Sequence, residues 1–287
     1  MSAIWGSAFF AIKISVETIN PITVASIRLI IGAVLLLIYF KFKKLSINYS
    51  KEIIFKIFLI GLIGNFIPFS LISWAEIYIK SNTAGLLLSV APILTLLLSH
   101  YLTKDDKFTL VKFVSIIIGL MGVLFIFDIK SIFSISSEYS LNLIPKLAII
   151  IAALGYVVSS ILAYNLKQID SISLTTLATL FAAITSLPFV FIFEYQAQSS
   201  YSFYSIISLI YLGAFPTALA FLIRFYIISK AGPIFLSYVA YLIPVFAILW
   251  GFIFLNETIS SSTFIGVILV LLGVFISQKN LMMKKNT

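Results

Sequence analysis

Polar side chains stand near the middle of several long apolar stretches of this chain, and they are its first candidates for binding chemistry. In such surroundings a hydroxyl or amide must find a partner or a ligand. The candidates for substrate contact are Asn65, Ser89, Tyr156, Thr217, Tyr238 and Tyr241. The alternative role is helix–helix hydrogen bonding, worth about 0.6 kcal/mol per bond in a membrane.

Aromatic residues offer a second kind of contact. Trp5, Phe9, Phe66 and Trp74 could line a pocket for flat or apolar molecules, and Trp5 joins the substrate-binding candidates. Ordinary packing or an interfacial aromatic belt is the competing interpretation.

Four prolines interrupt the same stretches: Pro68, Pro92, Pro216 and Pro244. Proline removes a backbone donor and exposes a carbonyl one turn earlier. We therefore predict hinges that gate a binding site, although proline can also simply bend a membrane helix.

Charged residues inside apolar stretches are costly, at about 3 kcal/mol each, and they seek a partner or the interface. Lys13, Arg28 and Glu76 fall toward one end of their stretches, with Glu17 close by. Arg28 and Glu76 are predicted to gate the site as an ion pair, or to hold a carboxylate or phosphate. Snorkelling to the interface is the alternative; it is favoured for Lys13 and also predicted for Arg224.

Several kinds of chemistry are disfavoured by composition. There is no cysteine and a single histidine, His100, so we expect no metal site and no catalytic cluster. A P-loop is not found, and we expect no cofactor. The formal charge of +9 comes from lysines in short polar links, which indicates a membrane surface and not a nucleic acid.

The elements that must position these residues are membrane helices. Hydrophobic residues make up 61% of the 287 residues and charged residues 10%, against about 25% charged in soluble domains. A bilayer-spanning helix needs about 20 apolar residues. Ten stretches approach this length: 2–18, 22–40, 53–79, 81–102, 108–127, 146–165, 173–193, 203–228, 233–255 and 261–278. Almost no residues precede the first, and we expect the natural start to lie a little upstream.

Lysines in the links predict the orientation. With ten spans, 13 lysines fall on one side and three on the other. The positive side is the cytoplasmic one. We therefore expect a multi-pass protein of the inner or plasma membrane with both termini in the cytoplasm.

The ten stretches form two sets of five. Pro68 corresponds to Pro216, Pro92 to Pro244, and Asp105 to Glu257 thirteen residues beyond each second proline. The predicted units are a first repeat over 1–128, an external linker over 129–145 and a second repeat over 146–280. An odd number of spans per repeat inverts the second copy, as in many secondary transporters.

A family likeness is carried by four segments: WGSAFFAIK, PITVASIRLIIGAVLL, SNTAGLLLSVAPILTLLLSHYL and FLNETISSSTFIGVILVLLGVF. They resemble the EamA family of the drug/metabolite transporter superfamily over nearly the whole chain. An acidic pair, Asp105-Asp106, stands where that family usually has glutamate. The resemblance implies ten helices in an inverted repeat, a central cavity and transport of small metabolites, among which amino-acid export is prominent.

We therefore expect an all-α secondary transporter, and not an enzyme, that moves a small metabolite across the bilayer by alternating access. The metabolite is an amino acid or a related compound, and the direction is export. A membrane-embedded lipid-modifying enzyme, a channel, and a structural or receptor role are the alternatives.

Overall fold

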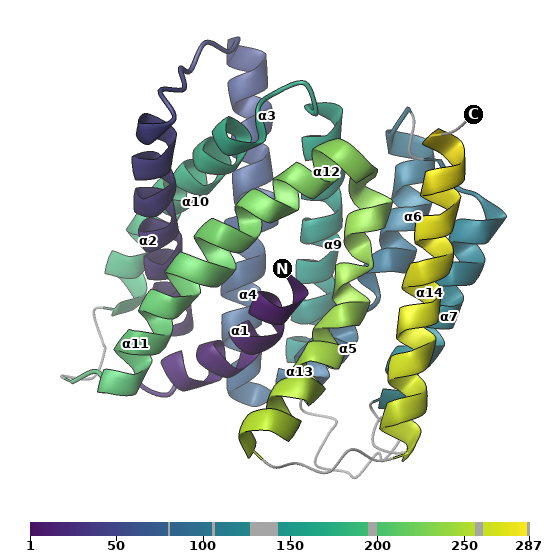
Figure 1. Cartoon of the computed structure of the whole chain (residues 1–287). Coiled ribbons are helices and arrows are strands. Elements are labelled where there is room, and N and C mark those ends of the chain that lie inside the picture. Colours follow the sequence, from purple (N-terminus) through teal and green to yellow (C-terminus); the bar gives the residue numbers. More distant parts are fainter. Residues whose placement is uncertain (80, 105–106, 127–142, 195–199, 256–260, 286–287) are drawn as a thin grey trace.

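Helices follow one another along the whole of the described chain (Figure 1). The computed structural model describes residues 1–79, 81–104, 107–126, 143–194, 200–255 and 261–285, and every regular element in them is helical. The first half contains α1 (Ser2–Ser15), α2 (Pro21–Phe42), α3 (Lys51–Gly61), η1 (Leu62–Phe66), α4 (Ile67–Tyr78), α5 (Ser81–Leu88), α6 (Ala91–Leu102) and α7 (Leu110–Ile126). The second contains α9 (Leu143–Asn165), α10 (Ser171–Glu194), α11 (Phe203–Leu212), η3 (Gly213–Leu219), α12 (Ala220–Ser237), α13 (Val239–Leu255) and α14 (Ser261–Lys285).

Within the described residues, six helical runs are long and apolar enough to cross a membrane: Pro21–Phe42, Lys51–Tyr78, Thr83–Leu102, Leu143–Asn165, Ser171–Ile192 and Phe203–Ser237. Three further apolar helices are shorter, namely Ser2–Ser15, Leu110–Ile126 and Ser261–Ile276. The prediction of an all-helical protein with many apolar spans is therefore confirmed, whereas the count of ten and the inverted repeat stay predictions.

One helix break coincides with a predicted boundary, and another falls inside a predicted span. Gly232 has φ 85° and ψ 167° inside α12, a backbone conformation open essentially to glycine alone. It lies between the predicted spans 203–228 and 233–255 and is followed by Pro233. In the first half, α5 ends at Leu88 and α6 begins at Ala91, within the predicted span 81–102.

The predicted linker over 129–145 lies mostly outside the described residues, as do Asp105, Asp106 and Glu257. Its last three residues are helical, because α9 already begins at Leu143. An apolar Leu-Ile pair directly before Pro145 extends the helix at this end, and proline is readily accepted in a first helical turn.

Both halves contain a π-helical segment beside one of the paired prolines. The segment η1 ends at Phe66, and Pro68 opens α4; Pro216 lies within η3. π-Helical turns are rare and occur frequently at functional sites. Their presence in both halves follows the correspondence of Pro68 and Pro216 seen in the sequence.

The helices α7 and α14 pack along each other at one side of the molecule (Figure 1). Glycines allow this close approach, since a Cβ on Gly122 would lie 2.7 Å from the carbonyl oxygen of Gly266. Small residues take this role in membrane helix pairs. These two helices correspond to the predicted spans 108–127 and 261–278.

Elsewhere the two halves of the chain interlock. Helix α3 contacts α10, and α4 contacts α9. A Cβ on Gly61 of α3 would lie 2.1 Å from the carbonyl oxygen of Ala178 in α10, so the two backbones are in direct contact there.

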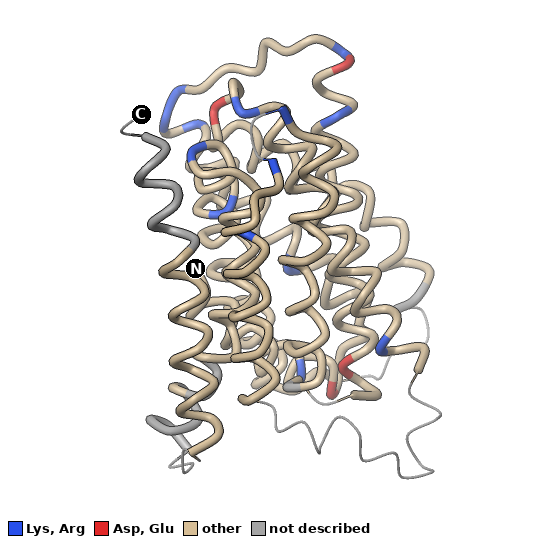
Figure 2. Tube along the Cα trace, turned by 90° about the vertical axis from the view of Figure 1, so that its right-hand side faces the viewer, with Lys and Arg blue, Asp and Glu red and all other residues tan. Residues whose placement is uncertain are grey.

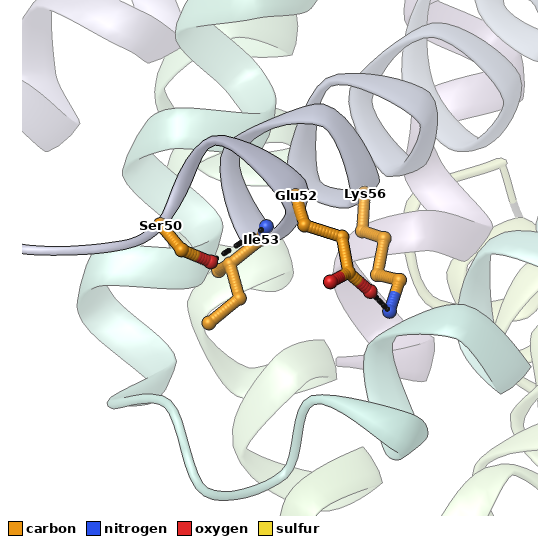
Figure 3. A network of polar contacts seen from close by, with 4 residues as sticks. All are labelled: Ser50, Glu52, Ile53 and Lys56. Atoms are coloured by element: carbon orange, nitrogen blue, oxygen red, sulfur yellow. Dashed lines mark hydrogen bonds and ion pairs between the residues drawn. The ribbon is translucent and has the colours of Figure 1, made fainter.

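Most of the described Lys and Arg residues gather at one end of the molecule (Figure 2), which is the end that holds the link between α2 and α3. Helix α3 begins there. Ser50 Oγ accepts from Ile53 N at 3.4 Å, and Lys56 pairs with Glu52 at 2.5 Å on the exposed surface (Figure 3). A serine cap followed by an ion pair one turn apart is typical of a water-exposed helix start.

Candidate functional site

A cavity of about 110 Å³ lies among helices of both halves. Its walls come from α1, α2, α4, α5 and α6 of the first half and from α9, α12 and α13 of the second. Apolar side chains such as Ile72, Val157 and Ile243 form most of the lining. At 10–15 Å³ per water-sized group, there is room for roughly seven to eleven such groups. The size fits a small metabolite.

Aromatic rings form one wall of this cavity. Phe69 of α4 lies with its ring centroid 6.5 Å from Tyr156 of α9 and 5.6 Å from Phe221 of α12. The Trp5 ring of α1 lies 5.8 Å from Phe221, and Trp5 Nε1 donates to the carbonyl of Pro216 at 3.1 Å. Four helices from the two halves therefore meet in one aromatic cluster.

Arg224 lines the cavity and is 1% exposed. Its Nη2 donates to Ser159 Oγ at 2.7 Å, Ser160 Oγ at 3.0 Å and the Tyr156 carbonyl at 3.2 Å. Both serine hydroxyls donate to that same carbonyl, which leaves their lone pairs for the guanidinium. Its Nη1 is buried without a hydrogen-bond partner.

Arg28 also lines the cavity and is 3% exposed. Its Nε donates to Thr217 Oγ1 at 3.1 Å, and its guanidinium carbon lies 3.7 Å from the centroid of the Phe69 ring. Thr217 in turn donates to the Leu212 carbonyl, five residues earlier, as the π-helical turn of η3 allows. Stacking on an aromatic face and a hydroxyl partner thus fix this guanidinium.

Glu76 is fully buried near the end of α4. Its Oε2 accepts from Ser81 Oγ at 3.0 Å, and its Oε1 is without a hydrogen-bond partner. Lys13 donates to the Glu76 backbone carbonyl at 2.5 Å. The described residues show no ion pair from Glu76 to Lys13 or Arg28, since their one ion pair is Lys56–Glu52. Lys13, which is half-buried, thus contacts the last turn of α4.

The cavity brings together three of the predicted site residues: Trp5, Arg28 and Tyr156. Thr217 lies behind it as the partner of Arg28. Ser89 and Asn65 are buried and do not line it: Ser89 Oγ donates to Leu86 O, and neither amide atom of Asn65 has a hydrogen-bond partner.

Tyr238 and Tyr241 contact α7 and do not line the cavity. The Tyr238 hydroxyl lies 2.6 Å from Ser115 Oγ, and the Tyr241 hydroxyl donates to the Ile116 carbonyl at 3.1 Å. Gly119 makes room for the second ring, because a Cβ there would lie 2.5 Å from it. The two tyrosines dock the start of α13 on α7.

This placement predicts a change in stability without a change in substrate affinity for Tyr241→Phe. Loss of its buried hydrogen bond is expected to cost about 1 kcal/mol, measured as a lower Tm of the purified protein. The concentration of substrate at half-maximal transport should stay within about twofold of the wild-type value. A larger shift in that concentration with an unchanged Tm would contradict the placement.

The paired prolines differ in position. Pro68 and Pro92 lie in the first turns of α4 and α6, whereas Pro216 and Pro244 lie inside η3 and α13. Among the other aromatic candidates, Phe9 lines the cavity. Phe66 packs against Phe189, and Trp74 against Tyr78.

The snorkelling prediction for Arg224 is wrong. Its span was expected to end at residue 228, which placed the arginine near an interface, but α12 continues to Gly232 before it breaks. The adjacent serines of α9 that hold it, Ser159 and Ser160, were not among the predicted site residues. An arginine facing a Ser-Ser pair at similar depth in the other half is the signal that could have identified them.

Comparison with known proteins assigns the chain to a family. A model of the EamA-like transporter family matches residues 1–128 and 143–278. The chain belongs to this family. An uncharacterized transporter of Archaeoglobus fulgidus is 30% identical over 273 residues, which are 95% of this chain and 94% of that EamA-like relative. The uncharacterized transporter YoaV of Bacillus subtilis is 26% identical over 280 residues, covering 96% and 94% of the two chains.

A crystal structure resembles this EamA-like chain with a TM-score of 0.77 at 18% identity, covering 96% of this chain and 93% of the other. That likeness bears on the fold alone. Family membership confirms the resemblance seen in the sequence and makes this chain a membrane transporter by family.

Proposed function

We propose that the protein is a secondary transporter that moves a small metabolite, an amino acid or a related compound, through the described cavity by alternating access, with export as the net direction. The observation that carries the proposal is the origin of the cavity walls. They come from both segments matched by the family model. A site at the interface of two repeats is the usual arrangement in secondary transporters.

Two five-span repeats, over 1–128 and 146–280, are part of the proposal. The π-helical segments beside Pro68 and Pro216 support it, and so does the peripheral pairing of α7 with α14, the last helix of each half. None of the described side chains of α7 and α14 is in the cavity lining. They would brace the two moving bundles from outside.

The end rich in Lys and Arg would face the cytoplasm of the cell's inner or plasma membrane, together with both termini. At the opposite end of the spans, Glu76, Lys13 and Ser81 join α4, α1 and α5. We assign these contacts to an external gate that must break when the cavity opens outward. Pro68, Pro92, Pro216 and Pro244 would absorb the accompanying change in helix angle.

Counterflow in proteoliposomes tests the proposal. Vesicles preloaded with a mixture of unlabelled amino acids should accumulate an externally added labelled one transiently and saturably, because a carrier exchanges substrate across the membrane. Vesicles without protein provide the background. Flux that rises linearly with concentration and shows no stimulation by internal substrate would identify a pore and overturn the proposal.

Trp5→Phe should weaken transport by roughly fivefold. It keeps the aromatic ring of the wall but removes the hydrogen bond from Trp5 to the Pro216 carbonyl, whose loss is worth about 1 kcal/mol. The measurement is the initial rate of counterflow at low substrate. Trp74→Phe, at a residue that does not line the cavity, is the control and should transport normally. Equal rates for both variants would argue against Trp5.

A further inference from the structure

The cavity holds positive charge that the protein itself balances only in part. Arg28 and Arg224 both line it, and both are at least 97% buried. A buried arginine in a membrane protein costs about 3 kcal/mol to insert and is retained for function in most cases. The two guanidinium groups come from opposite halves of the chain, α2 and α12.

Arg28 has a counter-charge and Arg224 has none. The carboxylate of Glu76 acts electrostatically on Arg28 and on Lys13. No carboxylate in the described part of the chain acts on Arg224, and its hydrogen bonds go to two hydroxyls and one carbonyl. Among the described residues, Glu76 is the single buried carboxylate. One arginine at the cavity is therefore left without an acid.

The same arginine has an unused donor. Nη1 of Arg224 is buried with no hydrogen-bond partner, although an unpaired donor on a buried charged group is costly. Three aromatic rings, those of Tyr156, Phe221 and Phe225, lie 5.0–5.5 Å from its guanidinium carbon and restrict its position. Nη1 is thus a donor for which the described residues supply no acceptor.

We propose that the substrate carries a carboxylate that pairs with Arg224, on a small apolar body that fills the rest of the cavity. This inference rests on the proposed transport function and names the feature of the substrate that the site recognises. One unbalanced charge matches one carboxylate, whereas a phosphate dianion would need more donors than the single free Nη1. The apolar lining fits a hydrocarbon body.

The described lining residues include no acid that could pair with an ammonium group. The lining hydroxyls of Thr95 and Ser237 already donate to carbonyls of their own helices. An amino group on the substrate would thus find hydroxyl lone pairs and aromatic ring faces but no opposite charge, and the carboxylate is the dominant contact. A carboxylic acid without an amine should bind at least as well as the corresponding amino acid.

Three molecules of one shape separate these contributions: 4-methylpentanoate, leucine and 3-methylbutylamine. Binding to the purified wild-type protein is measured by calorimetry and by the shift in Tm. We expect saturable binding of 4-methylpentanoate, equal or weaker binding of leucine, and no binding of the amine. Binding of the amine as tight as that of the acid would overturn the proposal. Inorganic phosphate binding in place of 4-methylpentanoate would do so as well.

Variants then locate the contact. Arg224→Gln should weaken binding of 4-methylpentanoate at least tenfold, and Arg224→Lys less, because it keeps the charge. Ser160→Ala retains the arginine but removes one of its acceptors, so a loss of a few-fold is expected even if the arginine variants fail to fold. Lys230→Gln, at an exposed position of the same helix, should bind normally. Full binding by both Arg224→Gln and Ser160→Ala would refute the assignment.

These measurements are independent of transport. Carboxylate-dependent binding without any counterflow would leave the Arg224 contact in place and overturn the proposed function. Counterflow of some compound with no preference for a carboxylate would leave the proposed transport function in place and overturn the Arg224 contact.

Discussion

Replacing Gly61 by alanine is expected to destabilise the protein by about 3 kcal/mol, the upper range for inserting atoms into a packed interior. The added Cβ would lie 2.1 Å from the Ala178 carbonyl oxygen. No flexible side chain can yield at this point, because both contacting groups belong to helix backbones. The helices α3 and α10 must move apart, and the contact between the two halves loosens.

The measurement is the Tm of purified protein in a mild detergent, which should fall by roughly 6–12 °C for this loss of stability. Gly85→Ala is the matched control, since a Cβ there meets nothing within 4 Å. Its Tm should equal or exceed that of the wild type, because alanine favours the helix. Equal Tm values for the two variants would show that α3 and α10 are not in backbone contact at Gly61.

Gly232→Ala should lower both stability and transport. The observed φ of 85° with ψ 167° is accessible essentially to glycine, and a side chain there costs of order 1–3 kcal/mol. The break at Gly232 also separates two parts of α12 that both line the cavity, with Arg224 before it and Leu236 and Ser237 after it. A straightened or displaced helix would change the spacing of these groups, so we expect at least a tenfold loss in the counterflow rate.

Asparagine provides a sharper test of the conformation at Gly232. It tolerates the left-handed helical region but not the region observed here, so Gly232→Asn should be as defective as Gly232→Ala. Ala231→Gly, one residue earlier, is the control and should transport nearly normally. Recovery of stability and counterflow with asparagine would place Gly232 in the left-handed helical region instead.

Much of the fold could be predicted because length and polarity are read directly from a membrane sequence. The predicted stretches 22–40, 53–79 and 173–193 match α2, the run from α3 to α4, and α10 to within a few residues. The breaks within spans were less accessible. The break at Gly232 falls at a predicted boundary, but the break between α5 and α6 falls inside the predicted span 81–102, and nothing in the composition indicates the π-helical turns of η1 and η3.

The sequence predicted how deep in the membrane the site residues lie, but not which way their side chains point. Tyr156 and Tyr241 were both expected to contact substrate, yet Tyr156 lines the cavity and Tyr241 contacts α7. In a soluble helix the polar face shows which side is buried. In a membrane helix lipid and protein interior are both apolar, so the sequence does not show which way a mid-span residue points.

For Arg224, the residues that decide its position lie far away in the sequence. A charged residue in an apolar stretch has two ordinary outcomes, the interface or a buried partner. The choice depends on where the helix ends and what faces it. Here the decisive partners, Ser159 and Ser160, are about 65 residues away in the chain, and no local pattern connects them to the arginine.

The backbone contact at Gly61 also bears on how this chain can change over evolutionary time. A bulkier residue at position 61 can be accommodated only if α10 retreats near Ala178, so substitutions in one half must be answered in the other. The two halves of the chain therefore cannot diverge independently at such close backbone contacts. In an alignment of relatives, positions 61 and 178 should covary, although they lie in different halves of the chain.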